Sequence, residues 1–330
     1  MGKPFEALVA RMLGGDRGAL AKLITLVENR APERTEILSR LHDRFGHAYT
    51  IGITGPPGAG KSTVVDRLVG RFRAAGQQVG IVAVDPSSPF SGGAVLGDRI
   101  RMQSHFLDDG VFIRSLSSRG SVGGLARAAR DVVRLLDAAG KDVIVVETVG
   151  VGQTEFDIVR LASTVVVVLV PEAGDTVQAM KAGLLEIADI FVVNKADREG
   201  ALRIKSELET MIQLRPAADR RTPVLLTVAT EGQGIDGLLD AIAEHRHFLT
   251  RSGAGAARVA AGRREEFLAI LRDEVSARVE SGVRHGRFHN LLEQVEHGDV
   301  DPYGAVVKVL ADEELRRALM APPDSGAGVR

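Results

Sequence analysis

The sequence feature that most constrains the fold is an eight-residue glycine-rich segment between an apolar run and a helical pattern. Residues 55–62 read Gly-Pro-Pro-Gly-Ala-Gly-Lys-Ser, which matches the pattern G-x-x-x-x-G-K-[ST]. The segment follows the strand candidate 50–54 and precedes apolar residues at helical spacing over 61–75. In that context it predicts a loop whose backbone N–H groups surround a phosphate at a helix N-terminus. A plain glycine-rich turn is the alternative interpretation.

Short apolar runs alternate with helical patterns from about residue 50 to residue 249. Most of the runs are apolar on both faces, as expected for parallel strands covered by helices on both sides. The strand candidates are 50–54, 79–84, 111–115, 143–146, 164–170, 190–193 and 224–228. The helical patterns between them cover 61–75, 123–139, 154–162, 175–187, 200–213 and 234–249. This order predicts an α/β fold with a doubly wound, mostly parallel sheet.

Helical patterns also flank this α/β domain. Before it, a Gly-Gly-Asp break at 14–16 and Pro32 separate three amphipathic stretches, which we expect to pack on the side of the sheet. The chain thus divides into an N-terminal helical extension (1–48), the α/β domain (49–250), a C-terminal helical arm (251–320) and a disordered Pro/Gly-rich tail (321–330).

The C-terminal arm is predicted to begin with a hinge and to contain three helices. The hinge is Ser-Gly-Ala-Gly-Ala-Ala at 252–257, and the helices cover about 258–281, 287–297 and 302–319. Two interpretations remain open, a lid that packs on the same subunit and a dimerisation arm. We favour the arm because symmetric dimers are the commonest assembly.

Composition excludes several classes of protein. Lys and Arg total 42 against 43 Asp and Glu, so no global charge indicates a nucleic acid or an anionic membrane as partner. There is no cysteine, which excludes disulfides and thiol chemistry. The longest apolar run, 164–170, is too short to span a bilayer, and residues 1–16 lack the apolar stretch of a signal peptide. We therefore expect a cytoplasmic protein.

The glycine-rich loop carries the first set of candidate site residues. Lys61 is predicted to bridge the β- and γ-phosphates, the Ser62 hydroxyl to bind Mg²⁺, and Thr63 to lie near the α-phosphate. The predicted nucleotide contacts of this segment are Gly55, Pro56, Pro57, Gly58, Ala59, Gly60, Lys61, Ser62 and Thr63.

A second motif follows the strand candidate 143–146. The strand leads into Glu147-Thr148-Val149-Gly150, which predicts a carboxylate beside the magnesium ion and a Gly150 amide for the γ-phosphate. An acidic strand end that faces solvent is the alternative, and it is weakened by the preceding phosphate loop. Lys61, Glu147 and Gly150 are the candidate catalytic residues.

The third motif, Asn194-Lys195-Ala196-Asp197, follows the apolar run 190–193. The Asp197 carboxylate is suited to accept the N1–H and the 2-amino group of guanine, a pattern that adenine does not offer. Asn194 is expected to support the base edge and its loop, and the stem of Lys195 to cover the base. Ala229, Thr230 and Glu231 follow the last strand at the usual place of the final guanine loop. Together the three motifs predict a GTPase.

Two further aspartates are candidates for the magnesium environment, directly or through water. Asp85 follows the second strand in Asp-Pro-Ser-Ser, and Asp98 lies in Leu-Gly-Asp-Arg. An Asx-turn before Pro86 and a helix N-cap are the respective alternatives, and the sequence leaves both open.

The motifs taken in order resemble a known family. GITGPPGAGKST, VAVDPSS, GGAVLGDRIRM, VIVVETVGVGQTE and NKAD are similar to the MeaB/MMAA/ArgK family of G proteins, over most of the chain. That family belongs to the dimeric GTPases related to signal-recognition-particle proteins and to nickel-insertion GTPases. The resemblance implies GTP or GDP with Mg²⁺ as cofactors, with Ser62, Asp85, Asp98 and Glu147 around the metal.

The resemblance also implies a partner and a regulated activity. It implies a homodimer that acts as chaperone for an adenosylcobalamin-dependent acyl-CoA mutase, chiefly methylmalonyl-CoA mutase, gating cobalamin loading and protecting the mutase. No glutamine follows Gly150 directly and no arginine finger is assigned, so we expect slow hydrolysis that the mutase accelerates. The candidate switch and coupling residues are Gln153, Asp175, Gln178 and Lys181, for which helix entry or an exposed helix face is the alternative.

Two other functions remain open at this stage. A small-molecule kinase on the same scaffold would tolerate ATP and need an acceptor pocket. A nickel-inserting GTPase would require a metal site rich in Cys or His. This chain has no Cys and eight scattered His, of which His285 and His289 form the closest pair at helical spacing.

Overall fold

The computed structural model describes residues 4–29, 31–85, 105–117, 124–148, 161–171, 183–214, 220–284 and 288–320. The chain divides into two compact units, Met1–Ala254 and Gly255–Arg330.

The first unit is built on a seven-stranded sheet in which every pairing is parallel. The spatial order is β3-β2-β4-β1-β5-β6-β7. All seven strands were predicted from their apolar runs, and the fold class is confirmed. The strands are β1 (Tyr49–Thr54), β2 (Val79–Asp85), β3 (Val111–Ser117), β4 (Val143–Thr148), β5 (Thr164–Leu169), β6 (Ile190–Asn194) and β7 (Val224–Thr227).

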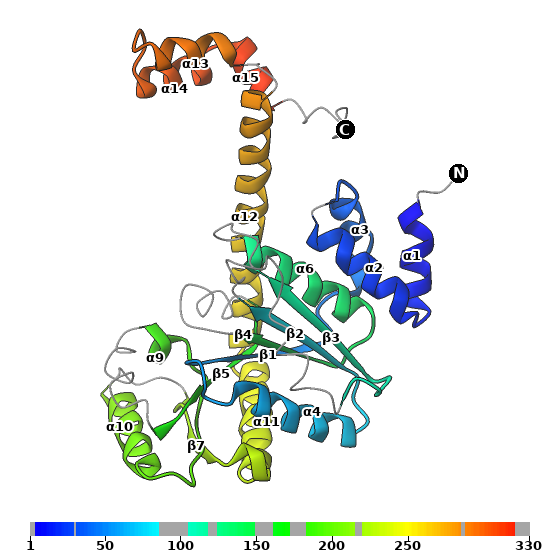
Figure 1. Ribbon diagram of the computed structural model, residues 1–330, viewed down its shortest axis with the longest axis vertical. Coiled ribbons are helices and arrows are strands. Elements are labelled where there is room, and N and C mark those ends of the chain that lie inside the picture. The colour runs from blue at the N-terminus through cyan, green and yellow to red at the C-terminus, as the bar shows by residue number, and fades with distance from the viewer. Residues whose placement is uncertain are drawn as a thin grey trace. The chain divides into compact units, whose positions relative to one another are not determined.

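Helices cover both faces of this sheet (Figure 1). α4 (Lys61–Ala74) and α11 (Ile235–Arg251) bury Val64, Leu68 and Leu238 in the core on one face. α6 (Gly124–Ala138) and α10 (Ala201–Gln213) contribute to the core on the other face, with the short α9 (Gly183–Ile187) packed against it. Burial on both faces explains why β4, β5 and β6 consist mainly of apolar residues, most of them Val.

The N-terminal helices belong to the same compact unit and pack beside α6, as Figure 1 shows. They are α1 (Pro4–Leu13), α2 (Arg17–Glu28), α3 (Arg34–Arg40) and the short 3-10 helix η1 (His42–Arg44). The predicted break at residues 14–16 is present, since Asp16 caps α2 by accepting from the Ala19 amide. A buried ion pair between Arg34 and Asp131 ties α3 to α6. Burial raises the pKa of Asp131, outweighing the opposing effect of Arg34.

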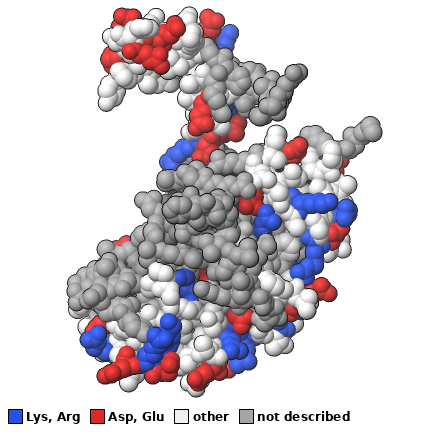
Figure 2. Space-filling view, in the orientation of Figure 1, with Lys and Arg blue, Asp and Glu red and all other residues white. Residues whose placement is uncertain are grey.

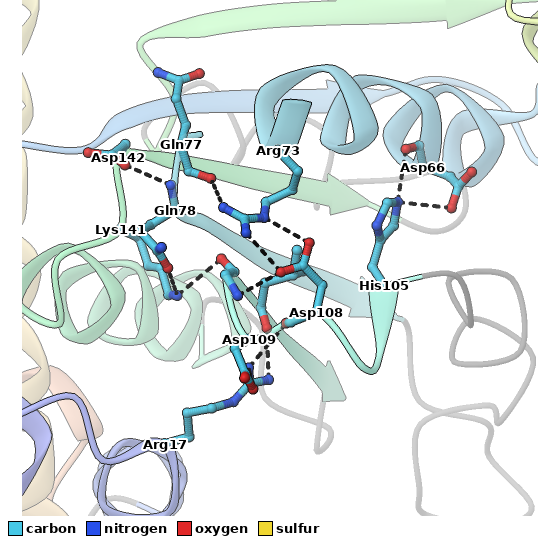
Figure 3. A network of polar contacts seen from close by, with 12 residues as sticks. Arg17, Asp66, Arg73, Gln77, Gln78, His105, Asp108, Asp109, Lys141 and Asp142 are labelled. Atoms are coloured by element: carbon cyan, nitrogen blue, oxygen red, sulfur yellow. Dashed lines mark hydrogen bonds and ion pairs between the residues drawn. The ribbon is translucent and has the colours of Figure 1, made fainter. Parts of the chain in front are cut away.

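A network of polar side chains joins the end of α4 to the turn before β3 (Figure 3). Asp108 in that turn accepts from Arg73 Nε at 2.8 Å and from Arg73 Nη2 at 2.9 Å. The hydrogen bond from Arg73 is the largest influence that lowers the pKa of Asp108, followed by the bond from the Gly110 amide. Arg17 of α2 donates to the Asp108 carbonyl at 3.2 Å. The turn is therefore held by groups from two helices.

The second unit is helical. α12 (Ala254–Arg284) is followed by α13 (His289–Glu296), α14 (Pro302–Ala311) and α15 (Glu313–Met320). The exposed residues Glu293, Glu296, Asp299 and Asp301 make the end formed by α13 and α14 acidic in Figure 2.

Two sequence predictions in this part of the chain are wrong. The hinge predicted at 252–257 is limited to Ser252 and Gly253, because α12 begins at Ala254 and its alanines favour helix enough to accommodate Gly255. The single helix predicted over 302–319 is two helices, because Asp312 adopts an extended conformation and its carboxylate accepts from the amides of Glu314 and Leu315.

None of the described helices is both long enough and apolar enough to cross a membrane.

Candidate nucleotide-binding site

The candidate site lies at the carboxyl edge of the sheet, where β1, β4, β6 and β7 end. The strands β2, β3 and β4 lie on one side of β1 in the sheet, and β5, β6 and β7 lie on its other side. The direction in which the chain adds strands therefore reverses at β1. Open α/β sheets bind their ligands at such a switch point. The parallel registers bring the strand ends Thr54, Thr148, Asn194 and Thr227 to one edge, and Thr148 donates to the Thr54 hydroxyl at 2.9 Å.

The loop after β1 requires glycine at two positions. Gly55 has φ 137° and lies so close to β5 that a side chain would overlap the Val168 carbonyl. Gly60 has φ 84°, and a side chain there would overlap the side-chain amide of Asn194. Only glycine combines these conformations with such close approach. The glycines of the predicted pattern therefore fix the shape of the loop as well as its access to a phosphate.

The ammonium group of Lys61 closes this loop. Lys61 Nζ donates to the carbonyls of Gly55 at 2.8 Å and Pro56 at 2.9 Å, and the residue is 6% exposed. A cation is thereby held over the segment that is predicted to surround the phosphates. Thr63, on the first turn of α4, is half-buried.

Ser62 and Glu147 meet beside the loop although 85 residues separate them in sequence. The Ser62 hydroxyl donates to Glu147 Oε1 at 2.7 Å, and both residues are buried. A hydroxyl and a carboxylate are oxygen ligands of the kind that Mg²⁺ prefers, and Mg²⁺ is usually held by few protein groups together with substrate phosphates. The two residues therefore fit the predicted metal environment.

Asn194 connects three parts of the site. Its Nδ2 donates to the Ala59 carbonyl in the phosphate loop at 2.9 Å. Its Oδ1 accepts from the Thr227 hydroxyl at 3.0 Å and from the Ala229 amide at 3.1 Å. Both ends of the buried side-chain amide are thus used to join the phosphate loop to the loop after β7.

The residues after Asn194 form a turn with an unusual backbone. Lys195 has φ 57°, the left-handed region, and among the described residues it is the one non-glycine with positive φ. The amide of Ala196 donates to the Thr227 carbonyl at 3.0 Å, which anchors the turn to β7. Asp197 is exposed at the edge of the site. Non-glycine residues in this backbone region cluster at active sites and ligand clamps, which fits the prediction that this turn binds the base.

The loop after β7 forms a short 3-10 turn, η5 (Ala229–Glu231). Arg67 of α4 donates from Nε to the Ala229 carbonyl at 3.0 Å and from Nη2 to the Thr230 carbonyl at 2.6 Å. Sequence reasoning missed Arg67, because no motif relates it to a loop 162 residues away. A cavity of about 470 Å³ lies beside this contact, lined by Asp66, Arg67, Gly70, Arg71, His105, Glu231, Gly232 and Ile235.

Several predicted site residues lie outside the described residues. β2 ends at Asp85, whose side chain is not among the described groups. The others are Asp98, Gly150, Gln153, Asp175, Gln178 and Lys181.

A parallel sheet with a phosphate-loop motif after its central strand is typical of P-loop nucleotide-binding proteins, and the Asn-Lys-Ala-Asp turn narrows the class to GTPases. A sequence profile described as "Methylmalonyl Co-A mutase-associated GTPase MeaB" matches residues 20–284. The chain belongs to the MeaB family, which confirms the resemblance seen in its motifs. Membership makes it a GTPase that binds guanine nucleotides.

Individual relatives agree with this assignment. The chain is 51% identical over 311 residues to a putative GTPase of Pyrococcus abyssi, covering 93% of this chain and 96% of the relative. It is 34% identical over 272 residues to the mitochondrial methylmalonic aciduria type A homolog of Mus musculus, covering 77% and 66%. A crystal structure titled LAO/AO transport system kinase is similar with TM-score 0.67 and 27% identity, covering 94% and 98%.

The two alternative functions are not favoured. The family is a GTPase family, which argues against a small-molecule kinase. Within the described ranges there is no group of three or more His, Cys, Asp or Glu placed to hold a metal ion, which gives no support to a nickel site. His289 pairs with Glu293 on the surface of α13 at 3.2 Å.

Proposed function

We propose that this GTPase is a chaperone for an adenosylcobalamin-dependent acyl-CoA mutase, methylmalonyl-CoA mutase in the first place. The match of residues 20–284 to a mutase-associated GTPase family carries the proposal. In this role the nucleotide state gates the loading of cobalamin into the mutase and protects or reactivates the enzyme. The cytoplasm stays our prediction for its location.

We assign the nucleotide to the edge of the sheet at which β1 ends. The loop 55–60 and Lys61 receive the phosphates, and Ser62 with Glu147 holds Mg²⁺, joined by Asp85 and Asp98. Asp197 receives the guanine edge, covered by the stem of Lys195. Asn194 acts by holding the phosphate loop and the guanine loop together, which its hydrogen bonds to Ala59 and Ala229 support.

Hydrolysis in this site depends on stabilising charge that builds on the γ-phosphate. The Lys61 ammonium and the loop amides are fixed before the reaction, so little reorganisation is needed when that charge appears. Mg²⁺, when bound, neutralises charge on the β- and γ-phosphate oxygens. Glu147 and Ser62 would hold and orient the Mg²⁺ ion, and Gly150 would offer its amide to the γ-phosphate.

The proposed regulation acts through segments next to this site. Gln153 and the residues Asp175, Gln178 and Lys181 are proposed to couple the nucleotide state to the mutase. We propose that the partner completes the orientation of the attacking water, because no glutamine directly follows Gly150 in the sequence. We therefore propose slow hydrolysis by the isolated protein and faster hydrolysis in the complex.

The GTPase rate with and without purified methylmalonyl-CoA mutase tests the proposal. We expect the mutase to raise kcat by about tenfold or more, since partner-supplied groups in P-loop GTPases are worth still larger factors. Lys61→Ala is the control, because it removes the phosphate-binding cation and should abolish both the basal and the stimulated rate. Equal rates with and without the mutase, together with no co-purification in either nucleotide state, would contradict the chaperone role.

A further inference from the structure

We propose that Arg67 is a positioning residue for guanine selectivity, which it exerts by fixing the peptide group between Ala229 and Thr230. The inference rests on the proposed assignment of residues 229–231 to the guanine loop. It adds a residue from the helix after the phosphate loop to the machinery that selects the base.

The guanidinium group of Arg67 holds two consecutive carbonyls of the loop. Nε donates to the Ala229 oxygen at 3.0 Å, and Nη2 donates to the Thr230 oxygen at 2.6 Å. The fork of the guanidinium suits two acceptors at once, which a lysine does not reproduce. Two bonds from one rigid group define the orientation of the loop better than either bond alone.

The Ala229 carbonyl belongs to the same peptide group as the Thr230 amide. A peptide group is planar and trans, so its N–H points away from its C=O. The bond from Arg67 therefore directs the Thr230 N–H away from α4. A positively charged donor on the oxygen also polarises the group and strengthens the N–H as a donor.

The neighbouring amides of the loop already have acceptors in the protein. The Ala229 amide donates to Asn194 Oδ1 at 3.1 Å, and the Glu231 amide donates to the Val228 carbonyl at 3.0 Å. The Gly232 amide donates to the Ala229 carbonyl at 3.2 Å. These bonds leave the Thr230 amide as the donor that we assign to the 6-oxygen of guanine.

The helix that carries Arg67 is itself fixed to the phosphate end of the site. α4 begins at Lys61 and buries Val64, Val65 and Leu68 against the sheet. Arg67 therefore connects a rigid element that starts at the phosphates with the loop at the base. Asn194 makes a second connection between the same two loops, through Ala59 and Ala229.

Three diphosphates separate the contributions to base recognition. GDP carries both the 6-oxygen and the 2-amino group, and IDP lacks the 2-amino group that is assigned to Asp197. The 5′-diphosphate of 2-aminopurine riboside lacks the 6-oxygen and, with it, the N1–H, so its affinity for the unaltered protein is the reference for its affinity for each variant. We expect Arg67→Ala to lower the affinities for GDP and IDP by the same factor, about fivefold, which corresponds to the loss of one partly exposed hydrogen bond. The affinity for the 2-aminopurine nucleotide should be the same in Arg67→Ala as in the unaltered protein.

Arg71→Ala is the matched control. Arg71 lies one turn further along α4, lines the same cavity and pairs with the exposed Asp236 at 2.7 Å. It should leave all three affinities unchanged, and Arg67→Lys should recover only part of the loss. If Arg67→Ala lowered the affinity for all three nucleotides equally, or lowered none of the three affinities, the inference would be overturned. If the unaltered protein failed to prefer GDP to ADP, the guanine assignment itself would fall instead.

Discussion

Asn194 occupies the space that a side chain at position 60 would need, and this single contact shapes two loops. Gly60 approaches the Asn194 amide so closely that any Cβ would displace it. The displaced amide would lose its bonds to Ala59, Thr227 and Ala229, which are buried. The absence of a side chain at Gly60 thus allows Asn194 to join the phosphate loop to the guanine loop.

Replacing Gly60 by alanine is therefore expected to be more damaging than replacing Gly58. Both glycines have positive φ, 84° and 76°, and so carry a similar conformational penalty of about 1 kcal/mol. Nothing lies within 4 Å of a Cβ at Gly58, whereas Gly60→Ala also breaks the Asn194 contacts. We expect Gly60→Ala to lower the free energy of unfolding by about 2–3 kcal/mol. Urea unfolding of the two nucleotide-free variants measures the difference, and equal losses would refute it.

At the scale of elements, the turn before β3 shows how an ion pair holds a helix end to a strand. Arg73 near the end of α4 reaches Asp108, and a side chain at Gly110 would overlap the Arg73 guanidinium. The two charged side chains are 23% and 30% exposed, so their attraction is partly screened by solvent. The contact is expected to contribute about 1 kcal/mol to stability.

That contribution depends on pH in a defined direction. The folded-state pKa of Asp108 lies below the ordinary aspartate value of 3.8 because Arg73 and the Gly110 amide donate to the carboxylate. The stabilisation is therefore fully present above pH 3.8 and is lost as pH falls through the folded-state pKa. Asp108→Asn should be less stable than the unaltered protein at pH 6, and the gap should shrink in acid.

Asp109→Asn is the control for this prediction. Asp109 is the next residue along the chain, its side chain is fully exposed, and it meets Arg17 only at 3.5 Å. Its substitution should change stability little at any pH. Urea unfolding from pH 3 to pH 6 makes the comparison, and a gap for Asp108→Asn that is independent of pH would rule out the ion pair as its cause.

The elements and motifs that follow from local patterns were predictable from sequence. The strands were found because burial on both faces makes most of them short apolar runs, and the phosphate loop because its glycines recur at fixed spacing. The contacts of Arg67 and the hydrogen bonds of the Asn194 side-chain amide could not be predicted from the sequence. They depend on which distant segments the parallel registers bring together. The break at Asp312 was missed because one capping carboxylate interrupts an otherwise helical pattern.

At the scale of the whole molecule, two helices of the second unit expose several large apolar side chains each. On α12, Val259, Phe267, Ile270 and Leu271 are 53%, 64%, 40% and 48% exposed. On α14, Tyr303, Val306, Val307 and Leu310 follow helical spacing and are all more than half exposed. Exposed large apolar side chains grouped on the face of a helix are typical of an interaction site. They support the proposal that this unit is a dimerisation arm.

We therefore expect a homodimer of twice the 35.1 kDa chain mass that depends on the apolar face of α12. Phe267→Asp with Leu271→Asp places two carboxylates on that face, where burial in an interface would be unfavourable, and should convert the dimer to monomer. Ser276→Asp adds a carboxylate to an exposed position roughly half a turn away from Phe267 around the same helix, and should leave the dimer intact. Sedimentation velocity over a range of concentrations measures both masses, with circular dichroism to verify that each variant remains folded. A monomeric unaltered protein, or a dimer that survives both substitutions on the apolar face, would exclude this face of α12 as the interface.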